Sequence, residues 1–323
     1  MSQAQGEFDL IRRIQAAARP GASRPGIVLG IGDDAALLQP PPGHLVVVTT
    51  DMLMDGRHFI LAEHGAEAVG IKAMGVNLSD LAAMAALPWA AFASVALPRT
   101  SEVGDANAIA HGLLQGIRRV SEDHQMVLAG GDTNAWDGPL VVSITLLGLV
   151  EDDPPGAVFR SGARPGDTLA VTGPLGGSIL GRHLRPQPRI AEARALRAHL
   201  KLHALIDLSD GLASDLRRLS EASNGWGIEL DEWAIPIHDD AQRLAQMSGR
   251  SPLDHALNDG EDFELCLATP ETLDPDRLAN LPTHLIPIGR VVDRPGFFLR
   301  AANGMIRPLE PGGFDHLRDS TNS

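Results

Sequence analysis

Six short acidic segments, each punctuated by glycine, serine or threonine, constrain this chain more than any other feature. Each lies where an apolar, strand-like run ends or a helix begins. They read GIGDDAAL (30–37), TTDMLMDGRHF (49–59), NLSDLAAM (77–84), GGDTN (130–134), DLSDGLASDL (207–216) and DGEDFEL (259–265). Carboxylates brought close together repel, by roughly 4 kcal/mol per pair at 4 Å with an effective dielectric of 20. A fold that gathers them needs a cation, and Mg²⁺ suits such hard oxygen ligands and bridges to phosphate oxygens.

The formal net charge of −14 excludes the classes of protein that bind by positive charge. It argues against a nucleic-acid backbone or an anionic membrane as a partner. An acidic protein that handles phosphates must reverse the local sign of charge, with metal ions or with arginines. The 323 residues, of which 44% are hydrophobic, suffice for two ordinary domains.

The remaining composition points to a cytoplasmic protein. The single cysteine, Cys266, lies in a strand-like run, cannot form an internal disulfide, and is expected to be a buried, inert thiol. No signal peptide is visible. The apolar stretch 81–98 is interrupted by Pro88, so we expect the end of a helix, a turn and a buried strand rather than a membrane span. Lysine occurs only at Lys72 and Lys201, and no GxxxxGK[ST] loop is present, which excludes a Walker-type nucleotide site.

The order of apolar periodicities predicts an α/β protein with two domains. Helical spacing predicts helices over 8–18, 62–86, 105–121, 191–200 and 212–223, and a further helix after the GPLGGS turn at 173–178. Strand-like runs predict strands over 27–31, 45–50, 89–97, 126–129, 140–150, 167–173, 227–230, 263–268 and 285–292. The Pro- and Gly-rich stretch 151–167 breaks the pattern, so we expect domains at 1–150 and 151–323.

Two of the acidic segments, GIGDDAAL and GGDTN, predict glycine loops that approach a ligand. Gly30 and Gly32 let the backbone approach a ligand closely, with Asp33 and Asp34 projecting from the same loop; the alternative is an ordinary Gly-Asp turn. The paired glycines before Asp132 predict a loop whose backbone N–H groups approach phosphate.

Two further segments carry possible ligands beside apolar elements. Thr49, Thr50 and Asp51 are expected at the C-terminal end of a strand, where α/β proteins commonly place ligands. His58 could pair with an anionic substrate group, although a lone histidine is more often structural. Asp80 lies inside a helical pattern among apolar neighbours, where an unpaired carboxylate is costly. It is read as a metal ligand, or alternatively as a helix N-cap.

The last two segments lie in the second half of the chain. Asp207, Ser209 and Asp210 come just before a helix, and Ser209 or Asp210 could be its N-cap, which explains one residue of the three. Glu261 and Asp262 precede a strand, where they could be ordinary turn polarity.

As an ordered set, these segments resemble the thiamine-monophosphate kinases, of the superfamily that includes aminoimidazole ribonucleotide synthetase. GEFDLI (6–11), RSGARPGD (160–167) and GGFDHL (312–317) extend the resemblance over nearly the whole chain. It implies ATP-dependent phosphorylation of thiamine monophosphate to thiamine diphosphate. It also implies a two-domain synthetase-like α/β (α+β) fold, in which an N-terminal mixed sheet pairs with its copy in a homodimer, a C-terminal α/β domain follows, and ATP binds between the domains.

The resemblance also implies roles for particular residues. Those that would coordinate several Mg²⁺ ions are Asp34, Thr49, Thr50, Asp51, Asp80, Asp132, Asp207 and Asp210. Those that would contact ATP are Gly131, Asp132, Arg160 and Ser209. Those that would contact the thiamine substrate are His58, Glu261 and Phe314. This chain has Asp259 where the family often has glycine, which adds a charge near the substrate end.

The implied mechanism is direct in-line transfer of the γ-phosphoryl group. The acceptor is a phosphate monoester with a second pKa of about 6, so it is largely deprotonated near neutral pH. Positioning and charge stabilisation then matter more than covalent chemistry. We therefore expect neither a covalent nucleophile nor a general base.

Several rival functions stay open at this point. Selenophosphate synthetase and the hydrogenase-maturation relative need a reactive cysteine that Cys266 does not match, and aminoimidazole ribonucleotide synthetase fits the motifs less well. Outside the superfamily, clustered aspartates could hold two metals in a phosphatase. A third class is a nucleotide-binding module without turnover.

Overall fold

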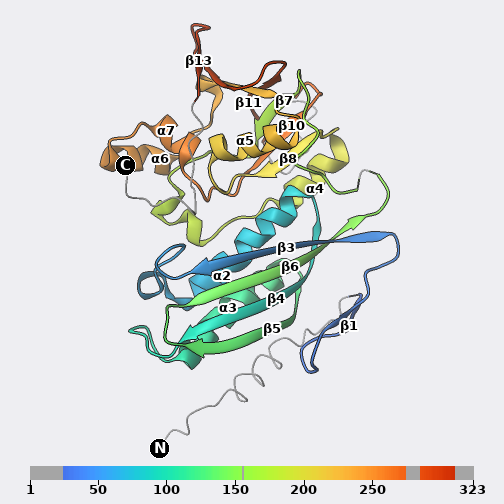
Figure 1. The fold of residues 1–323 in the computed structure, drawn as a ribbon, viewed down its shortest axis with the longest axis vertical. Coiled ribbons are helices and arrows are strands. Elements are labelled where there is room, and N and C mark those ends of the chain that lie inside the picture. Colours follow the sequence, from blue (N-terminus) through green and yellow to red (C-terminus); the bar gives the residue numbers. More distant parts are fainter. Residues whose placement is uncertain (1–24, 155, 274–283, 310–323) are drawn as a thin grey trace, which may run out of the picture. The chain divides into compact units, whose positions relative to one another are not determined.

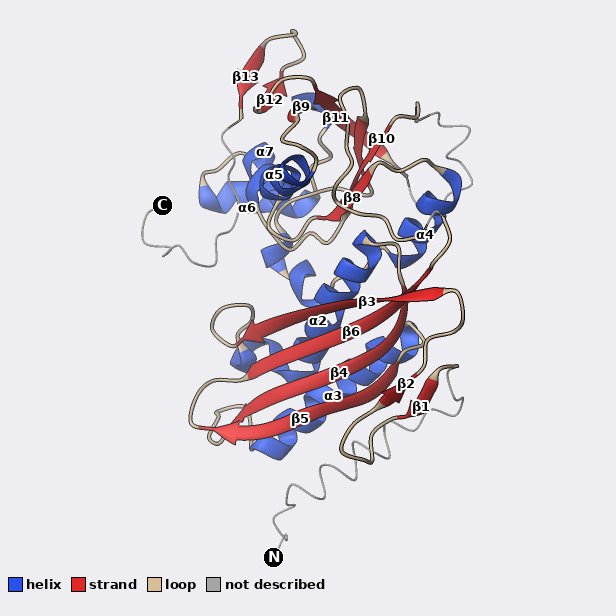
Figure 2. Ribbon diagram, turned by 45° about the vertical axis from the view of Figure 1, so that its right-hand side comes forward, coloured by secondary structure: helices blue, strands red, loops and turns tan. Residues whose placement is uncertain are grey.

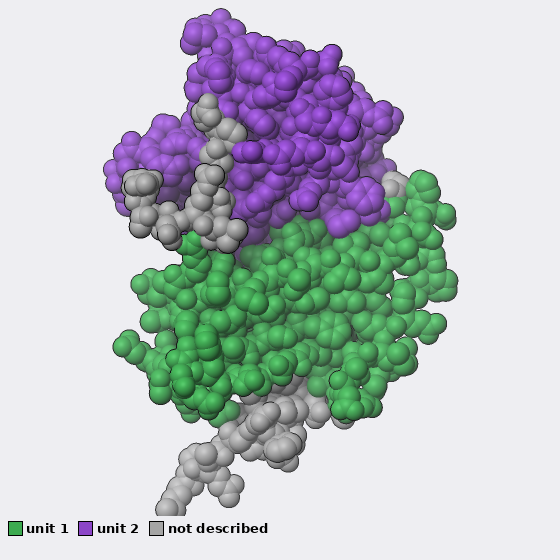
Figure 3. Space-filling view, in the orientation of Figure 1, with its two compact units in different colours: residues 1–81, 86–156 green, residues 82–85, 157–323 purple. Residues whose placement is uncertain are grey.

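The computed structural model describes residues 25–154, 156–273 and 284–309, and the chain divides into two compact units (Figure 3). Unit 1 comprises Met1–Leu81 and Ala86–Gly156, and unit 2 comprises Ala82–Ala85 and Ala157–Ser323. The helix predicted over 8–18 lies outside the described residues.

Unit 1 is a four-stranded sheet with two helices on one face (Figures 1 and 2). In spatial order the strands are β3 (His44–Met54), β6 (Val141–Glu151), β4 (Leu87–Pro98) and β5 (Val127–Trp136). Only β4 and β5 pair in parallel. The helices are α2 (Leu61–Ala83) and α3 (Ala106–Asp123), and a hairpin of β1 (Ile27–Leu29) and β2 (Leu37–Leu38) precedes the sheet.

Alternation along β3 sets the two faces of this sheet. Val47 and Leu53 are buried on the helix side, whereas Val48 and Met52 are 62% and 58% exposed on the other. The two helices pack closely because glycine lies at their contact: a Cβ at Gly116 of α3 would lie 2.2 Å from a backbone oxygen of α2. Among the described residues of unit 1, the outward side chains of β3 are therefore left exposed.

Two strands of unit 1 are longer than their apolar runs predict. β3 continues through Met54 and β5 through Trp136, because cross-strand pairing with β6 and β4 extends into the polar residues. Thr49–Asp51 therefore lie in the middle of a strand and not at its C-terminal end, and GGDTN is part of a strand and not a loop.

Unit 2 contains a seven-stranded mixed sheet flanked by helices (Figure 1). In spatial order the strands are β13 (Ile306–Pro308), β12 (Phe297–Arg300), β9 (Gly227–Asp231), β11 (Ile286–Val292), β7 (Thr168–Val171), β10 (Leu265–Thr269) and β8 (Ala204–Asp207). The α-helices are α4 (Ile190–His199), α5 (Leu212–Ala222), α6 (Asp239–Ser248) and α7 (Pro252–Asn258).

The helix predicted after the GPLGGS turn is wrong in type. Two 3-10 turns, η1 (Ser178–Leu180) and η2 (Arg182–Leu184), occupy that segment. Gly177 and Gly181 separate them from the preceding chain and from each other at φ values of 74° and 129°, which no α-helix continues. A third short turn, η3, spans Glu232–Ala234.

Two expectations about buried segments are confirmed. Cys266 lies inside β10 with no exposed surface, and burial raises the pKa of its thiol to about 12, as expected for an inert cysteine. The stretch 81–98 is the end of α2, a turn and strand β4. Among the helices that the structure describes, none is long and apolar enough to cross a membrane.

Candidate functional site

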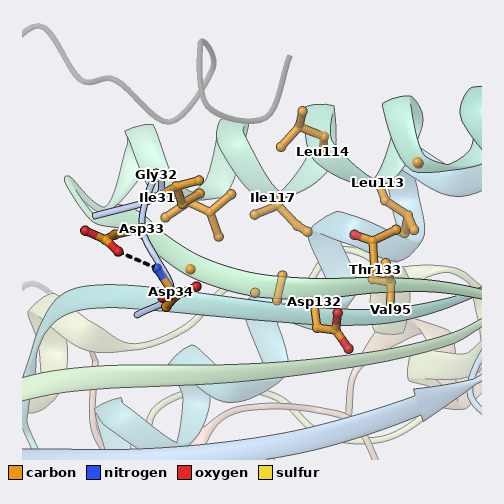
Figure 4. Close-up of a pocket in the computed structure, with 15 residues that line it drawn as sticks. Ile31, Gly32, Asp33, Asp34, Val95, Leu113, Leu114, Ile117, Asp132 and Thr133 are labelled. Carbon is orange, nitrogen blue, oxygen red and sulfur yellow. Dashed lines mark hydrogen bonds between the residues drawn. The ribbon is translucent and has the colours of Figure 1, made fainter. Parts of the chain in front are cut away.

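A cavity of about 560 Å³ in unit 1 brings two of the acidic segments together. The loop after β1 contributes Asp33 and Asp34, and β5 contributes Asp132 (Figure 4). The other walls are apolar and come mainly from β4, β5 and α3; they include Ala93, Val95, Ala110, Leu113, Leu114, Ile117 and Leu128. An apolar chamber with carboxylates at its edge suits a ligand with a flat ring and a charged, metal-binding tail.

Strand alternation separates the polar residues of β5. Thr133 points toward α3, and Asp132 points to the opposite side of the sheet (Figure 4). Gly131 has no room for a side chain, because a Cβ there would lie 2.0 Å from the Ala93 carbonyl oxygen. The pairing register of β4 and β5 shifts by one residue between Ala91 and Phe92, just before the pair Ala93 and Gly131. The glycines thus permit close pairing of β5 with β4 beside the cavity. This segment is a strand, where the sequence predicted a phosphate-binding loop.

Asp80 and Thr49 form a second polar pair in unit 1. The Thr49 hydroxyl on β3 donates a hydrogen bond to Asp80 Oδ2 on α2. Burial raises the pKa of Asp80, and the Thr49 bond opposes that shift. The N-cap alternative for Asp80 is wrong, since this residue lies in the last part of α2. A half-buried carboxylate whose charge is disfavoured by its surroundings is chemically suited to a cation.

The other predicted residues of β3 lie on both faces of the sheet. Thr50 faces outward, where its Oγ1 accepts a hydrogen bond from Thr145 at 3.0 Å. Asp51 alternates with it and faces the helices. His58 follows in the turn after β3, and its Nδ1 accepts the Met54 N–H at 3.0 Å. That bond requires the neutral ring to carry its proton on Nε2.

Lys72 is a polar feature of unit 1 that the sequence did not single out. It lies on α2 with no exposed surface. Its Nζ donates to the His58 carbonyl oxygen at 2.6 Å and so holds the turn that carries His58. The only sequence signal was the scarcity of lysine, which gave no indication of burial.

In unit 2 the segments DLSDGLASDL and DGEDFEL lie side by side. Backbone hydrogen bonds join Glu261 N to Ser209 O at 2.7 Å and Phe263 N to Leu208 O at 2.9 Å. Gly260 is required here, since a Cβ would lie 2.7 Å from the Ser209 carbonyl oxygen. The structure thus brings Ser209, Asp210 and Glu261 to one place in unit 2.

Asp210 is held by an arginine that sequence reasoning missed. Arg218 of α5 contacts the carboxylates of both Asp210 and Asp215. Burial raises the pKa of Asp215 to about 7, although it accepts the Asp210 N–H and faces Arg218. The N-cap alternative is wrong for both Ser209 and Asp210, because Gly211 occupies the N-cap of α5 and no side chain caps the helix.

Asp259 does not carry an uncompensated charge. Its carboxylate accepts the Gly177 N–H at 3.0 Å and contacts His255 at 2.8 Å and Arg250 at 3.1 Å. The neighbouring Asp262 is buried, and burial raises its pKa to about 7 despite the Gly176 N–H and Arg182. Both carboxylates therefore anchor the glycine turn at 176–177 to the DGEDFEL segment.

The remaining predicted residues are placed as follows. Asp207 ends β8 and is buried. Arg160 is exposed in the segment before β7, and its carbonyl oxygen accepts a hydrogen bond from Ser223 at 3.4 Å. Phe314 lies outside the described residues.

Within the described ranges, no group of three or more histidine, cysteine or acidic side chains is close enough to form a metal cage. The donors present are single carboxylates and hydroxyls at Asp34, Asp132, and the Thr49 and Asp80 pair. Mg²⁺ is commonly bound by one or two carboxylates with waters and phosphate oxygens completing its shell. This donor set therefore fits Mg²⁺ that arrives with a phosphate ligand.

Comparisons with known proteins show what the chain is similar to. Residues 32–150 match the family model "AIR synthase related protein, N-terminal domain". The thiamine-monophosphate kinase of Rhodopirellula baltica is 42% identical over 301 residues, which covers 90% of this chain and 92% of that protein. The crystal structure of the enzyme of that name from Stenotrophomonas maltophilia is 35% identical with a TM-score of 0.76 and covers 91% of this chain and 96% of its own. A solved complex of AaThiL with AMPPCP and TMP is 30% identical, covers 98% of both chains and has a TM-score of 0.72.

Proposed function

Because the chain belongs to the thiamine-monophosphate kinase family, we propose that it transfers the γ-phosphoryl group of ATP to thiamine monophosphate. The products are thiamine diphosphate and ADP. The observation that carries this proposal is the 42% identity to a thiamine-monophosphate kinase over nine-tenths of the chain. The related complex with AMPPCP and TMP supports the same pair of substrates. A reaction that consumes ATP fits a cytoplasmic location.

We assign the nucleotide to the cavity of unit 1. Its apolar walls, including Val95, Leu113 and Ile117, suit a purine ring. Gly131 exposes backbone beside the cavity, and Asp34 and Asp132 lie at its edge. Arg160 and Ser209 are proposed to contact the nucleotide as well, on the basis of the family's motifs.

Mg²⁺ would be held by the carboxylates and hydroxyls that the resemblance singles out, which are Asp34, Thr49, Thr50, Asp51, Asp80, Asp132, Asp207 and Asp210. When bound, it would offset the negative charge on the phosphate oxygens. His58 and Glu261 would orient thiamine monophosphate, and the turn geometry gives His58 an Nε2–H that can donate to a phosphate oxygen. An oxygen of the acceptor phosphate attacks the γ-phosphorus in line, and the bond to the ADP oxygen breaks. No group of the chain needs to remove a proton.

Incubation of the protein with ATP, MgCl₂ and thiamine monophosphate tests this function directly. We expect thiamine diphosphate and ADP to appear in equal amounts when the thiamine species and nucleotides are separated by chromatography. Binding of ATP without turnover would favour a nucleotide-binding module. Release of thiamine in the absence of ATP would favour the phosphatase.

We further propose that the protein is a homodimer joined through the outer face of the unit 1 sheet. β3 is an edge strand, and one of its faces carries Val46, Val48, Met52 and Met54, which are 38% to 62% exposed. A contiguous apolar patch on a protein surface commonly marks an interface. A second copy of the same face would bury it symmetrically.

The dimer proposal predicts that the double substitution V48K/M52K makes the protein monomeric. Two lysines on this face would have to be buried without partners, which costs far more than the lost apolar contact. Sedimentation velocity at micromolar concentration measures the mass. The matched control is Met247→Lys, an equally exposed methionine on α6 of unit 2, which should leave the dimer intact. A wild-type monomer, or a double variant that remains dimeric, would contradict the proposed interface.

A further inference from the structure

The segment from Arg182 to Arg189 contacts the DGEDFEL loop at three successive points. Arg182 pairs with Asp262, and its Nη2 lies 3.1 Å from Oδ1. His183 Nδ1 lies 3.3 Å from Glu261 Oε2. Arg189 contacts both carboxylate oxygens of Glu264, through Nε and Nη2. Residues 182–189, which include the stretch RPQPR (185–189), are called the clamp below because of these three contacts.

The backbone of Glu261 is fixed independently of its side chain. Its φ is 63°, in the left-handed region that a residue with a side chain rarely adopts. Its N–H donates to the Ser209 carbonyl oxygen, and Gly260 before it abuts the same oxygen. A strained residue of this kind persists only where its surroundings determine it fully. The remaining freedom of Glu261 is in its side-chain torsions.

His183 is well placed to restrict those torsions. Its side chain is 5% exposed, whereas that of Glu261 is 31% exposed, so the carboxylate still reaches the solvent side. The neighbouring Arg182 is held in place, because it also donates hydrogen bonds to Asp240 at 3.0 Å and to the Gly176 carbonyl oxygen at 2.8 Å. A buried ring on an anchored turn thus faces one carboxylate oxygen.

We propose that His183 is a positioning residue for Glu261 and thereby sets the affinity for the thiamine part of the substrate. This inference rests on the function proposed above, in which Glu261 contacts thiamine monophosphate. The ligand group concerned is a cationic heteroaromatic ring system bearing an amino group, which a fixed carboxylate recognises by charge and by accepting a hydrogen bond. A carboxylate that rotates freely must be ordered on binding, which weakens affinity.

The test compares His183→Ala, His183→Asn and His183→Gln with the wild type. For His183→Ala and His183→Gln we expect the KM for thiamine monophosphate to rise about tenfold, with the KM for ATP and kcat changed less than about threefold. Asn should retain most of the affinity, because its amide nitrogen is attached to Cγ, as the ring Nδ1 that faces Glu261 is, whereas the amide nitrogen of Gln matches the position of Nε2. His199→Gln, on α4, is the surface control and should behave as wild type. The Asn and Gln pair keeps the comparison usable if His183→Ala does not fold.

A double-mutant cycle separates positioning from packing. In a Glu261→Ala background, His183→Gln should change the KM for thiamine monophosphate by less than about twofold, since its partner is already gone. An equal tenfold loss in both backgrounds, or a parallel rise in the KM for ATP, would overturn the proposal. Calorimetric binding of thiamine monophosphate gives the same comparison without turnover. A wild type that binds thiamine monophosphate but forms no diphosphate would refute the kinase function and still leave the role of His183 measurable.

Discussion

Asp132→Asn is expected to lower kcat for thiamine diphosphate formation by about 10²- to 10³-fold, with little change in the unfolding midpoint. Asp132 is exposed on β5 at the edge of the unit 1 cavity, so an isosteric amide disturbs no packing. The substitution removes one negative charge where the nucleotide and its Mg²⁺ are proposed to bind. Loss of one preorganised electrostatic contact with a transferring group costs this much in other enzymes.

The matched control is Asp137→Asn. Asp137 lies just past the end of the same strand with its side chain 92% exposed, so it tests whether loss of a nearby charge alone reduces activity. Steady-state kinetics at saturating and limiting MgCl₂ should show that only Asp132→Asn raises the Mg²⁺ concentration needed for half-maximal rate. Near-full activity of Asp132→Asn would rule out this carboxylate as a metal ligand and weaken the assignment of the nucleotide to this cavity.

The motif-bearing residues could be predicted from sequence because their chemistry is local. Glycine and aspartate at the ends of apolar runs singled out Asp34 and Asp132, and the structure places both at one cavity. What the pattern could not give was the conformation. The GGDT segment was predicted to be a loop, but it pairs with β4 as part of β5. This pairing is possible because Gly131 has no side chain to collide with Ala93.

The partners of the acidic residues were missed because they lie outside the acidic segments. Arg218 is eight residues from Asp210, and His183 is 78 positions from Glu261, so no local periodicity connects them. The pairing of His183 with Glu261 depends on the fold of unit 2, which brings two distant segments together. Sequence spacing predicts which elements form, but the choice of partner for a buried charge is a property of the assembled fold.

Arg189→Met should lower the free energy of unfolding by about 3 to 5 kcal/mol, which is the cost of breaking a buried ion pair from one side. Glu264 is 5% exposed. Arg189 Nε donates to Glu264 Oε2 at 2.9 Å, and Arg189 Nη2 contacts Glu264 Oε1. The Thr172 hydroxyl also donates to Glu264 Oε2. Methionine fills the space of the arginine stem but leaves the carboxylate without its counter-charge. Arg185→Met, at an exposed arginine of the same loop, is the control and should change stability by less than about 0.5 kcal/mol.

The decisive comparison adds Glu264→Gln to Arg189→Met. If the loss comes from an uncompensated charge, the double variant should be more stable than Arg189→Met alone, because the amide still accepts from Thr172 and carries no charge. Urea denaturation measures the free energy, and hydrogen exchange of the β10 amides places the loss in unit 2. A double variant no more stable than the single one would mean that Arg189 acts by packing. The clamp would then hold the DGEDFEL loop through shape, and the charge of Glu264 would contribute little to it.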